Sequence, residues 1–167
     1  MKLYMVSLGP GDYELITIKA LKALKNCDAI CVPTKSPDHS FTRSMTHKII
    51  QKLMEEFEFE KPLIPMYTPM HFKKEDWQYQ VDVITDSFTK YNNLSFVTLG
   101  DSAVYSTVYY LLDLFEAQNR VIYDNSEVIP GVTSFSNAGK ECTPDASLSP
   151  CLDSVASPLV TSCFTTS

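Results

Sequence analysis

Apolar positions along the chain recur with two periods, which together predict strands that alternate with helices. Short apolar runs, each followed by a turn or loop, cover residues 2–8, 28–33, 61–66 and 94–99. We interpret these runs as buried strands. The segments between them place apolar residues three and four positions apart, as on one face of a helix. These predicted helices cover residues 14–26, 42–57, 75–91 and 103–117.

The pattern is shorter and less regular towards the end of the chain. Residues 121–123 and 127–129 flank a polar turn, and we predict both as short strand pieces. Alternating strands and helices indicate an α/β fold, with a mainly parallel sheet flanked by helices. After about Lys140 neither period continues, and the composition turns to Ser, Thr, Pro and Cys. We therefore predict one domain over residues 1–139 and an irregular tail over residues 140–167.

Three glycine-containing turns each follow a predicted strand. They are Gly9-Pro10-Gly11-Asp12, Gly100-Asp101-Ser102 and Pro130-Gly131-Val132-Thr133-Ser134. The carboxyl ends of parallel strands meet at one edge of a sheet, where α/β proteins bind their ligands. The Gly100 turn also precedes a predicted helix, whose first N–H groups have no partner within the helix. The sequence therefore predicts a site for a small polar ligand at this edge.

Each turn also has a purely structural interpretation. The first turn is not a dinucleotide fingerprint, because Glu14 stands where G-x-G-x-x-G needs its third glycine. Its glycines either allow a ligand to approach or serve a tight turn. Asp12 could cap the helix that follows it, and Asp101 or Ser102 could cap the helix predicted from residue 103. No lysine follows Gly100 as it would in a phosphate-binding P-loop.

The side chains in and beside these turns likewise have either a structural or a ligand-binding role. Tyr105 either directs its hydroxyl to the site or buries its ring in the core. Thr133 or Ser134 either caps a helix that begins near Phe135 or hydrogen-bonds a ligand. One basic cluster near a predicted cleft loop is either a solvated surface or a contact for substrate carboxylates, and it comprises Lys35, His39, Arg43 and Lys48.

Composition narrows the possible partners. The 167 residues are 44% hydrophobic, enough to build a core, and the net charge of −6 argues against a general nucleic-acid binder. No apolar run approaches the ~20 residues of a membrane span, so we expect a cytoplasmic protein without a membrane partner. The five cysteines form no C-x-x-C pair, and histidines 39, 47 and 71 are scattered, so we expect reduced, structural thiols and no metal.

Taken together and in this order, the three turns and their strands resemble the tetrapyrrole methylase family, the class III S-adenosylmethionine-dependent methyltransferases. Residues 6–17 are similar to the opening motif of that family and residues 30–33 to its second strand, while residues 98–107 and 129–136 resemble the two later motifs. The resemblance covers about residues 1–139. The branch that methylates precorrin-2 at C-20 is indicated by Tyr105-Ser106-Thr107, Thr133-Ser134-Phe135-Ser136 and Ile64-Pro65-Met66.

The resemblance implies S-adenosyl-L-methionine as cofactor and a small-molecule tetrapyrrole as substrate. It implies methylation of the C-20 meso carbon of precorrin-2, or of cobalt-precorrin-2, in cobalamin biosynthesis, and it identifies no catalytic base. Gly9, Gly11 and Asp12 would border the substrate. The residues that it places at the cofactor are Pro10, Gly100, Asp101, Ser102, Tyr105, Thr133 and Ser134.

The chain departs from the family pattern in two ways. Tyr13 and Ser102 stand where the family usually has proline after Gly-Asp. Family members also continue as a second α/β domain that closes over the cofactor, and they tend to form homodimers, whereas residues 140–167 resemble nothing in that domain. We therefore expect the second domain to be missing. Two alternatives stay open, namely a catalytically inactive fragment and a sister methyltransferase such as diphthine synthase.

Overall fold

A computed structural model shows a five-stranded sheet in which every strand pair is parallel. It describes residues 1–38, 40–41, 44–68, 74–102 and 107–133. The strand order is β3-β2-β4-β1-β5, so β4 lies between β2 and β1. The strands are β1 (Lys2–Ser7), β2 (Ala29–Thr34), β3 (Leu63–Tyr67), β4 (Asn93–Thr98) and β5 (Ser126–Ile129). The predicted α/β fold with a mainly parallel sheet is confirmed.

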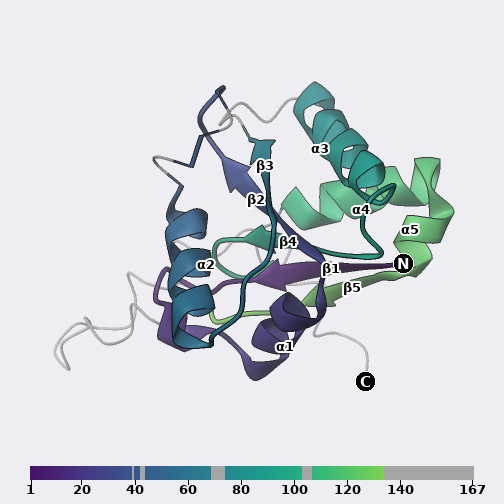
Figure 1. Ribbon diagram of the computed structural model, residues 1–167. Helices are drawn as coiled ribbons and strands as arrows, with labels where there is room; N and C mark the ends of the chain where they lie inside the picture. Colours follow the sequence, from purple (N-terminus) through teal and green to yellow (C-terminus); the bar gives the residue numbers. More distant parts are fainter. Residues whose placement is uncertain (39, 42–43, 69–73, 103–106, 134–167) are drawn as a thin grey trace, which may run out of the picture. The chain divides into compact units, whose positions relative to one another are not determined.

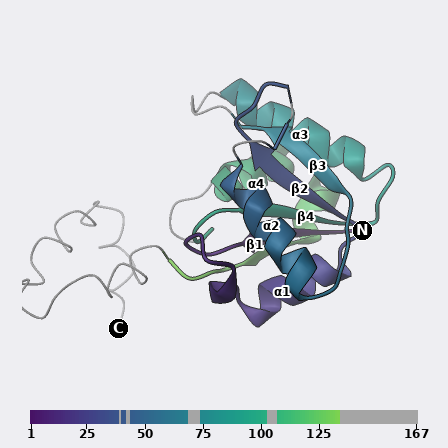
Figure 2. The same ribbon diagram turned by 60° about the vertical axis from the view of Figure 1, so that its left-hand side comes forward.

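Helices cover both faces of this sheet (Figures 1 and 2). They are α1 (Ile18–Asn26), α2 (Met45–Glu56), α3 (Lys74–Ser87), α4 (Thr107–Gln118) and α5 (Arg120–Asp124). In Figure 1, α1 and α2 lie in front of the sheet and α4 lies behind it. The chain divides into two compact units, Met1–Asn137 and Ala138–Ser167, and every described residue belongs to the first. The tail predicted over residues 140–167 lies outside the described residues.

Each face of the sheet has its own hydrophobic core. On one face, Leu24 of α1 and Ile50 of α2 are buried against alternate residues of the strands, such as Val6 and Val97. On the other face, Ile84 of α3 and Phe115 of α4 are packed with the intervening strand residues, such as Met5 and Phe96. Successive residues of a strand point to opposite faces, so strands buried on both faces are apolar throughout. This explains the continuous apolar runs in the sequence.

The helix predicted over residues 14–26 is interrupted in the structure. Tyr13–Leu15 form a single 3₁₀ turn, capped by Asp12, whose carboxylate accepts the Glu14 N–H at 3.0 Å. The α-helix begins only at Ile18, because the Thr17 hydroxyl accepts the Ala20 N–H at 3.2 Å. Ile18, although it fits the apolar spacing of the predicted helix over residues 14–26, is 74% exposed. The cap residue Thr17 therefore determines where the helix begins, and the spacing of apolar residues alone did not predict this position.

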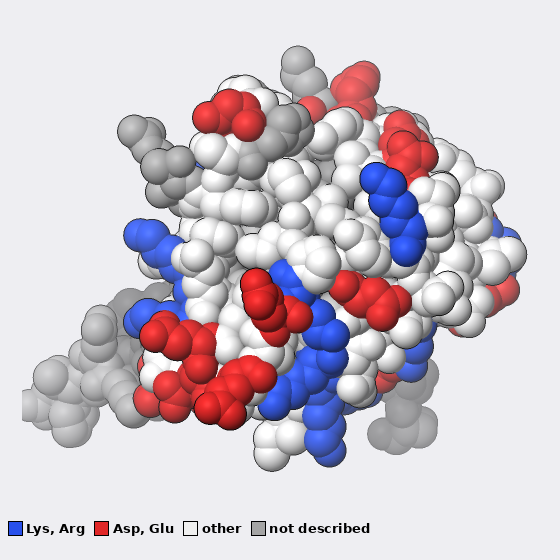
Figure 3. Space-filling view, in the orientation of Figure 1, with Lys and Arg blue, Asp and Glu red and all other residues white. Residues whose placement is uncertain are grey.

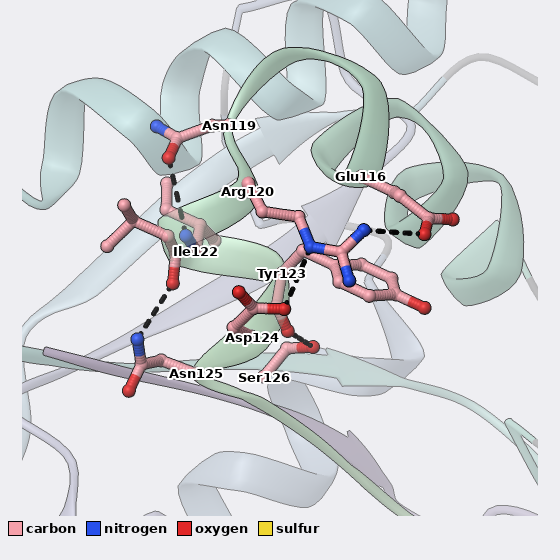
Figure 4. A network of polar contacts seen from close by, with 9 residues as sticks. Glu116, Asn119, Arg120, Ile122, Tyr123, Asp124, Asn125 and Ser126 are labelled. Carbon is pink, nitrogen blue, oxygen red and sulfur yellow. Dashed lines mark hydrogen bonds and ion pairs between the residues drawn. The ribbon is translucent and has the colours of Figure 1, made fainter.

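The strand piece predicted at residues 121–123 is wrong, because these residues lie in helix α5. The Asn119 side chain caps that helix by accepting the Ile122 N–H at 3.3 Å. Arg120 then pairs with Glu116 at 2.9 Å and with Asp124 at 3.0 Å, both one helical turn away (Figure 4). β-Branched and aromatic residues favour a strand, but the cap and the pairs at helical spacing stabilise a helix here.

Candidate ligand site at the carboxyl ends of the strands

The strand order indicates a candidate ligand site at the carboxyl ends of β1 and β4. The chain passes from β1 to α1 on one face of the sheet, and from β4 towards α4 on the other face, although β1 and β4 are neighbours. Connections that diverge from neighbouring strands leave a crevice at their carboxyl ends, where ligands bind in open α/β sheets. The first two of the predicted glycine turns lie at this point.

Gly9 and Gly100 join these two turns directly. The Gly9 N–H donates to the Gly100 carbonyl at 3.1 Å, and the Gly100 N–H donates to the Gly9 carbonyl at 2.7 Å. Both residues have a positive φ, +77° and +80°, which glycine adopts at little cost. Among the residues that the structure describes, and apart from its two chain neighbours, Gly100 has no atom within 4 Å of the place where a Cβ would stand.

The third turn is held against the other two. The Gly131 N–H donates to the Asp101 carboxylate at 3.2 Å, which connects the turn after β5 to the turn after β4. A Cβ on Gly131 would lie 2.7 Å from Ser7 Cβ and 3.2 Å from the Gly100 carbonyl oxygen. Because side chains do not pack that closely, glycine at this position allows the three turns to meet.

A buried pair of serines lies beneath this junction. Ser7, the last residue of β1, and Ser102 have no exposed surface. Their hydroxyl oxygens are 2.7 Å apart, and the Ser102 N–H donates to Ser7 Oγ at 2.9 Å. The Ser102 side chain is therefore engaged inside the protein. Sequence analysis assigned no role to Ser7, although a polar residue ending an otherwise apolar strand was the available signal.

The structure brings together many, but not all, of the predicted site residues. Gly9, Gly100, Asp101 and Ser102 converge with Gly131, as described above. Gly11 is half-buried with φ +123°, and Asp12 is exposed and caps the 3₁₀ turn. Pro10 and Thr133 are half-buried beside their turns. The predictions for Tyr105 and Ser134 fall on residues outside those that the structure describes.

Two further side chains lie next to strand ends at this edge. Leu99, directly after β4, is 46% exposed and so presents an apolar side chain to solvent. Lys35, directly after β2, is exposed. Of the other members of the basic cluster, Lys48 is exposed on α2, while His39 and Arg43 lie outside the described residues. Apolar, cationic and anionic groups are thus all available along the edge.

Charge elsewhere is mixed. On the face shown in Figure 3, the described acidic and basic side chains lie side by side near α1 and α2 rather than in one basic tract. Within the described ranges, no helix is long and apolar enough to span a membrane. The same residues contain no cluster of three or more acidic, histidine or cysteine side chains that could hold a metal ion.

Comparison with known proteins identifies the family. The family model for tetrapyrrole (corrin/porphyrin) methylases matches residues 2–142, which include all five strands and the three turns. The chain belongs to this family. A probable cobalt-precorrin-2 C(20)-methyltransferase from Methanocaldococcus jannaschii is 28% identical over 133 residues, and a cobalt-precorrin-2 C(20)-methyltransferase from Salmonella typhimurium is 30% identical over 137 residues.

This tetrapyrrole methylase chain spans about half the length of the curated relatives it matches. Each comparison covers 80% of the chain but 54% of the relative. A crystal structure of uroporphyrin-III C-methyl transferase from Thermus thermophilus, complexed with S-adenyl homocysteine, superposes with a TM-score of 0.58. It is 21% identical and covers 83% of this chain and 48% of that one. At this identity the superposition shows a shared fold.

Proposed function

We propose that this tetrapyrrole methylase chain holds S-adenosylmethionine at the three-turn junction and takes part in methylation of precorrin-2, or of cobalt-precorrin-2, at C-20 in the cytoplasm. The supporting observation is that the backbones of Gly9 and Gly100 are hydrogen-bonded to each other, and that the Asp101 carboxylate joins Gly131 to them, at the point where the β1 and β4 connections diverge. The names of the two curated relatives support the substrate class and position.

The residues at the junction fit the chemistry of the methyl donor. S-Adenosylmethionine combines a cationic sulfonium with an apolar, planar base and a polar amino-acid end. The exposed Leu99 side chain offers an apolar contact, and Asp101 offers a carboxylate. Glycine at position 100 has no side chain of its own, and the described residues leave open the place where its Cβ would stand, which favours the approach of a ligand to the main chain. Pro10 and Thr133, together with Tyr105 and Ser134, complete the proposed set of cofactor contacts.

When bound, the cofactor would supply an electrophilic methyl group. The residues of this chain would hold the reactants in place. Paired backbone hydrogen bonds fix the Gly9 and Gly100 turns, and the Asp101 carboxylate connects the Gly131 turn to them. A rigid, preorganised wall reduces the entropy lost when two reactants are brought together. We assign Gly9, Gly11 and Asp12 to the substrate side of this wall. Lys35 is the exposed cation suited to a substrate carboxylate.

Isothermal titration calorimetry of the full chain with S-adenosylhomocysteine tests the cofactor site. We expect binding in the micromolar range, weakened about tenfold or more by Asp101→Ala, because loss of the carboxylate frees the Gly131 turn. Asp28→Ala is the matched control, since the Asp28 carboxylate also accepts backbone N–H groups from another segment, those of Asn92 and Asn93, but lies before β2 and β4 rather than after a strand. Absence of binding at millimolar S-adenosylhomocysteine would contradict the proposed cofactor site.

Turnover assays test the proposed substrate. The full chain is incubated with S-adenosylmethionine and, in separate reactions, with precorrin-2, cobalt-precorrin-2 and the protein substrate of diphthine synthase. We expect methyl transfer to one of the first two compounds. Methylation of the protein substrate instead would identify a sister enzyme. Cofactor binding without any turnover would favour the inactive-fragment alternative.

A further inference from the structure

Ser7 contacts two of the turns that form the proposed cofactor site, although it belongs to neither. It ends β1, which lies between β4 and β5 in the sheet. Its side chain is fully buried, and its hydroxyl is 2.7 Å from the hydroxyl of Ser102 in the turn after β4. Its Cβ faces Gly131 in the turn after β5. A single side chain therefore contacts both the turn after β4 and the turn after β5.

The hydrogen bonds of Ser7 have no replacement among the described residues. Ser7 Oγ accepts the Ser102 N–H at 2.9 Å and forms a second hydrogen bond with Ser102 Oγ, in which either hydroxyl can be the donor. Removing the Ser7 hydroxyl leaves a buried N–H and a buried hydroxyl without these partners. Leaving buried polar groups unpaired costs more than the net value of the bond itself, so the turn would shift to recover partners.

The volume of Ser7 matters as much as its hydroxyl. A Cβ on Gly131 would stand 2.7 Å from Ser7 Cβ, so the chain at Gly131 already lies against the serine. The Asp101 carboxylate holds Gly131 in this place through its 3.2 Å hydrogen bond. Ser7 thus sets how closely the Gly131 turn approaches, while its hydroxyl sets the position of Ser102.

We propose that Ser7 is a positioning residue for the methyl donor, acting by fixing the spacing between the turns after β4 and β5. This inference rests on the proposed function, in which both turns contact the cofactor. Ser7 itself is buried and would touch neither cofactor nor substrate. Its contribution is to hold Asp101 and Gly131 in the geometry that the ligand requires.

The test compares Ser7→Ala and Ser7→Cys with Ser95→Ala in the full chain. Ser95 is an equally buried serine in β4 whose hydroxyl makes no hydrogen bond to any of the three turns. We expect Ser7→Ala to weaken S-adenosylhomocysteine binding about three- to tenfold, the range of one lost hydrogen bond. Ser7→Cys, which keeps a side-chain atom in place of the hydroxyl oxygen and a weak donor and acceptor, should recover part of the affinity. Ser95→Ala should leave affinity unchanged even where urea denaturation shows an equal loss of stability.

Amide hydrogen exchange of the unliganded chain provides a readout that does not depend on binding. In Ser7→Ala, exchange at Ser102 and Gly131 should accelerate more than at Phe96 in β4, whereas Ser95→Ala should affect all three alike. Failure of the wild-type chain to bind S-adenosylhomocysteine overturns the proposed function. Unchanged exchange at Ser102 and Gly131 in Ser7→Ala overturns the positioning role, as does equal loss of affinity in Ser7→Ala and Ser95→Ala.

Discussion

At the scale of single residues, the glycines of the junction are required for two different reasons. Gly9 and Gly100 adopt a left-handed backbone that other residues reach only with strain. Gly131 has no positive φ, and its constraint is the absence of room for a Cβ. Sequence analysis could recognise that all three turns needed glycine. It could not separate conformation from packing, because the neighbour of Gly131 is Ser7, far away along the chain.

This distinction predicts the behaviour of Gly131→Ala. The added methyl group would clash with Ser7 Cβ, and overpacking of this kind costs about 1–3 kcal/mol of unfolding free energy. The double variant S7G/G131A removes the opposing Cβ, so its loss should be smaller than the sum of the losses in S7G and G131A, although the Gly100 carbonyl oxygen still lies 3.2 Å from the new methyl group. Urea denaturation measures the free energy of unfolding of the two single variants and of the double variant. Strictly additive losses in the double variant would contradict the packing explanation.

At the scale of elements, the strands were easier to predict than the helix boundaries. Burial on both faces makes a strand apolar throughout, and this pattern is local, so the first four strands were found to within two residues. Helix α5 was missed because residues 121–123 favour a strand on their own. What selects the helix is the Asn119 cap and the pairing of Arg120 with Glu116 and Asp124.

Two ion pairs connect the edge strand β5 to β1 and α1. Glu127 lies 2.6 Å from Lys19 of α1 and 2.6 Å from Lys2 of β1. Hydrogen bonds from Lys19 and then Lys2 lower the pKa of Glu127 below its ordinary value of 4.5. The ionised form is thus favoured in the folded state, so the stabilisation is present above pH 4.5 and is lost as the pH falls through the lowered value.

Glu127→Gln should therefore destabilise the chain at pH 7 and have progressively less effect below pH 4.5. Because the pair is largely solvent-accessible, the loss at pH 7 should stay below about 1 kcal/mol. Urea denaturation of both proteins across this pH range measures the difference. Glu60→Gln, on an exposed segment between α2 and β3, is the control. A loss that persists undiminished at acid pH would show that the ion pairs are not its source.

At the scale of the whole sheet, the strand order is the feature that the sequence could not provide. Alternating periods predict a parallel sheet, but the insertion of β4 between β2 and β1 depends on contacts between segments far apart in the chain. That insertion places the Gly9 and Gly100 turns side by side. The same three turns were grouped from the sequence through the resemblance between motifs, whereas the contacts of Ser7 with two of them are visible only in the three-dimensional structure.

Two buried cysteines lie on opposite faces of the sheet, so their labelling measures the opening of each hydrophobic core separately. Cys27 is packed in the core beneath α1 and α2, and Cys31 in the core beneath α3 and α4. Burial raises the pKa of Cys27, and it raises that of Cys31 to about 12, so neither thiol is reactive in the folded protein.

Alkylation with iodoacetamide at pH 8 should be slow at both sites. If both cores open in one cooperative step, the two rates should coincide once each is normalised to the rate in urea. Tandem mass spectrometry is the measurement, because fragment ions separate the two cysteines within a single tryptic peptide. Markedly faster labelling of Cys27 alone would show that α1 and α2 can detach while the other face stays intact.

The stacking of Trp77 on Tyr110 has a consequence for optical measurements. The ring centroids are 4.2 Å apart and the planes differ by 6°, which joins α3 to α4. Because the sequence contains one tryptophan, emission excited at long wavelength has a single origin. The wavelength and intensity of this tryptophan fluorescence therefore depend on the contact between α3 and α4. A change on adding a nucleoside ligand would therefore mean that α4, which follows the Gly100 turn, had moved relative to α3.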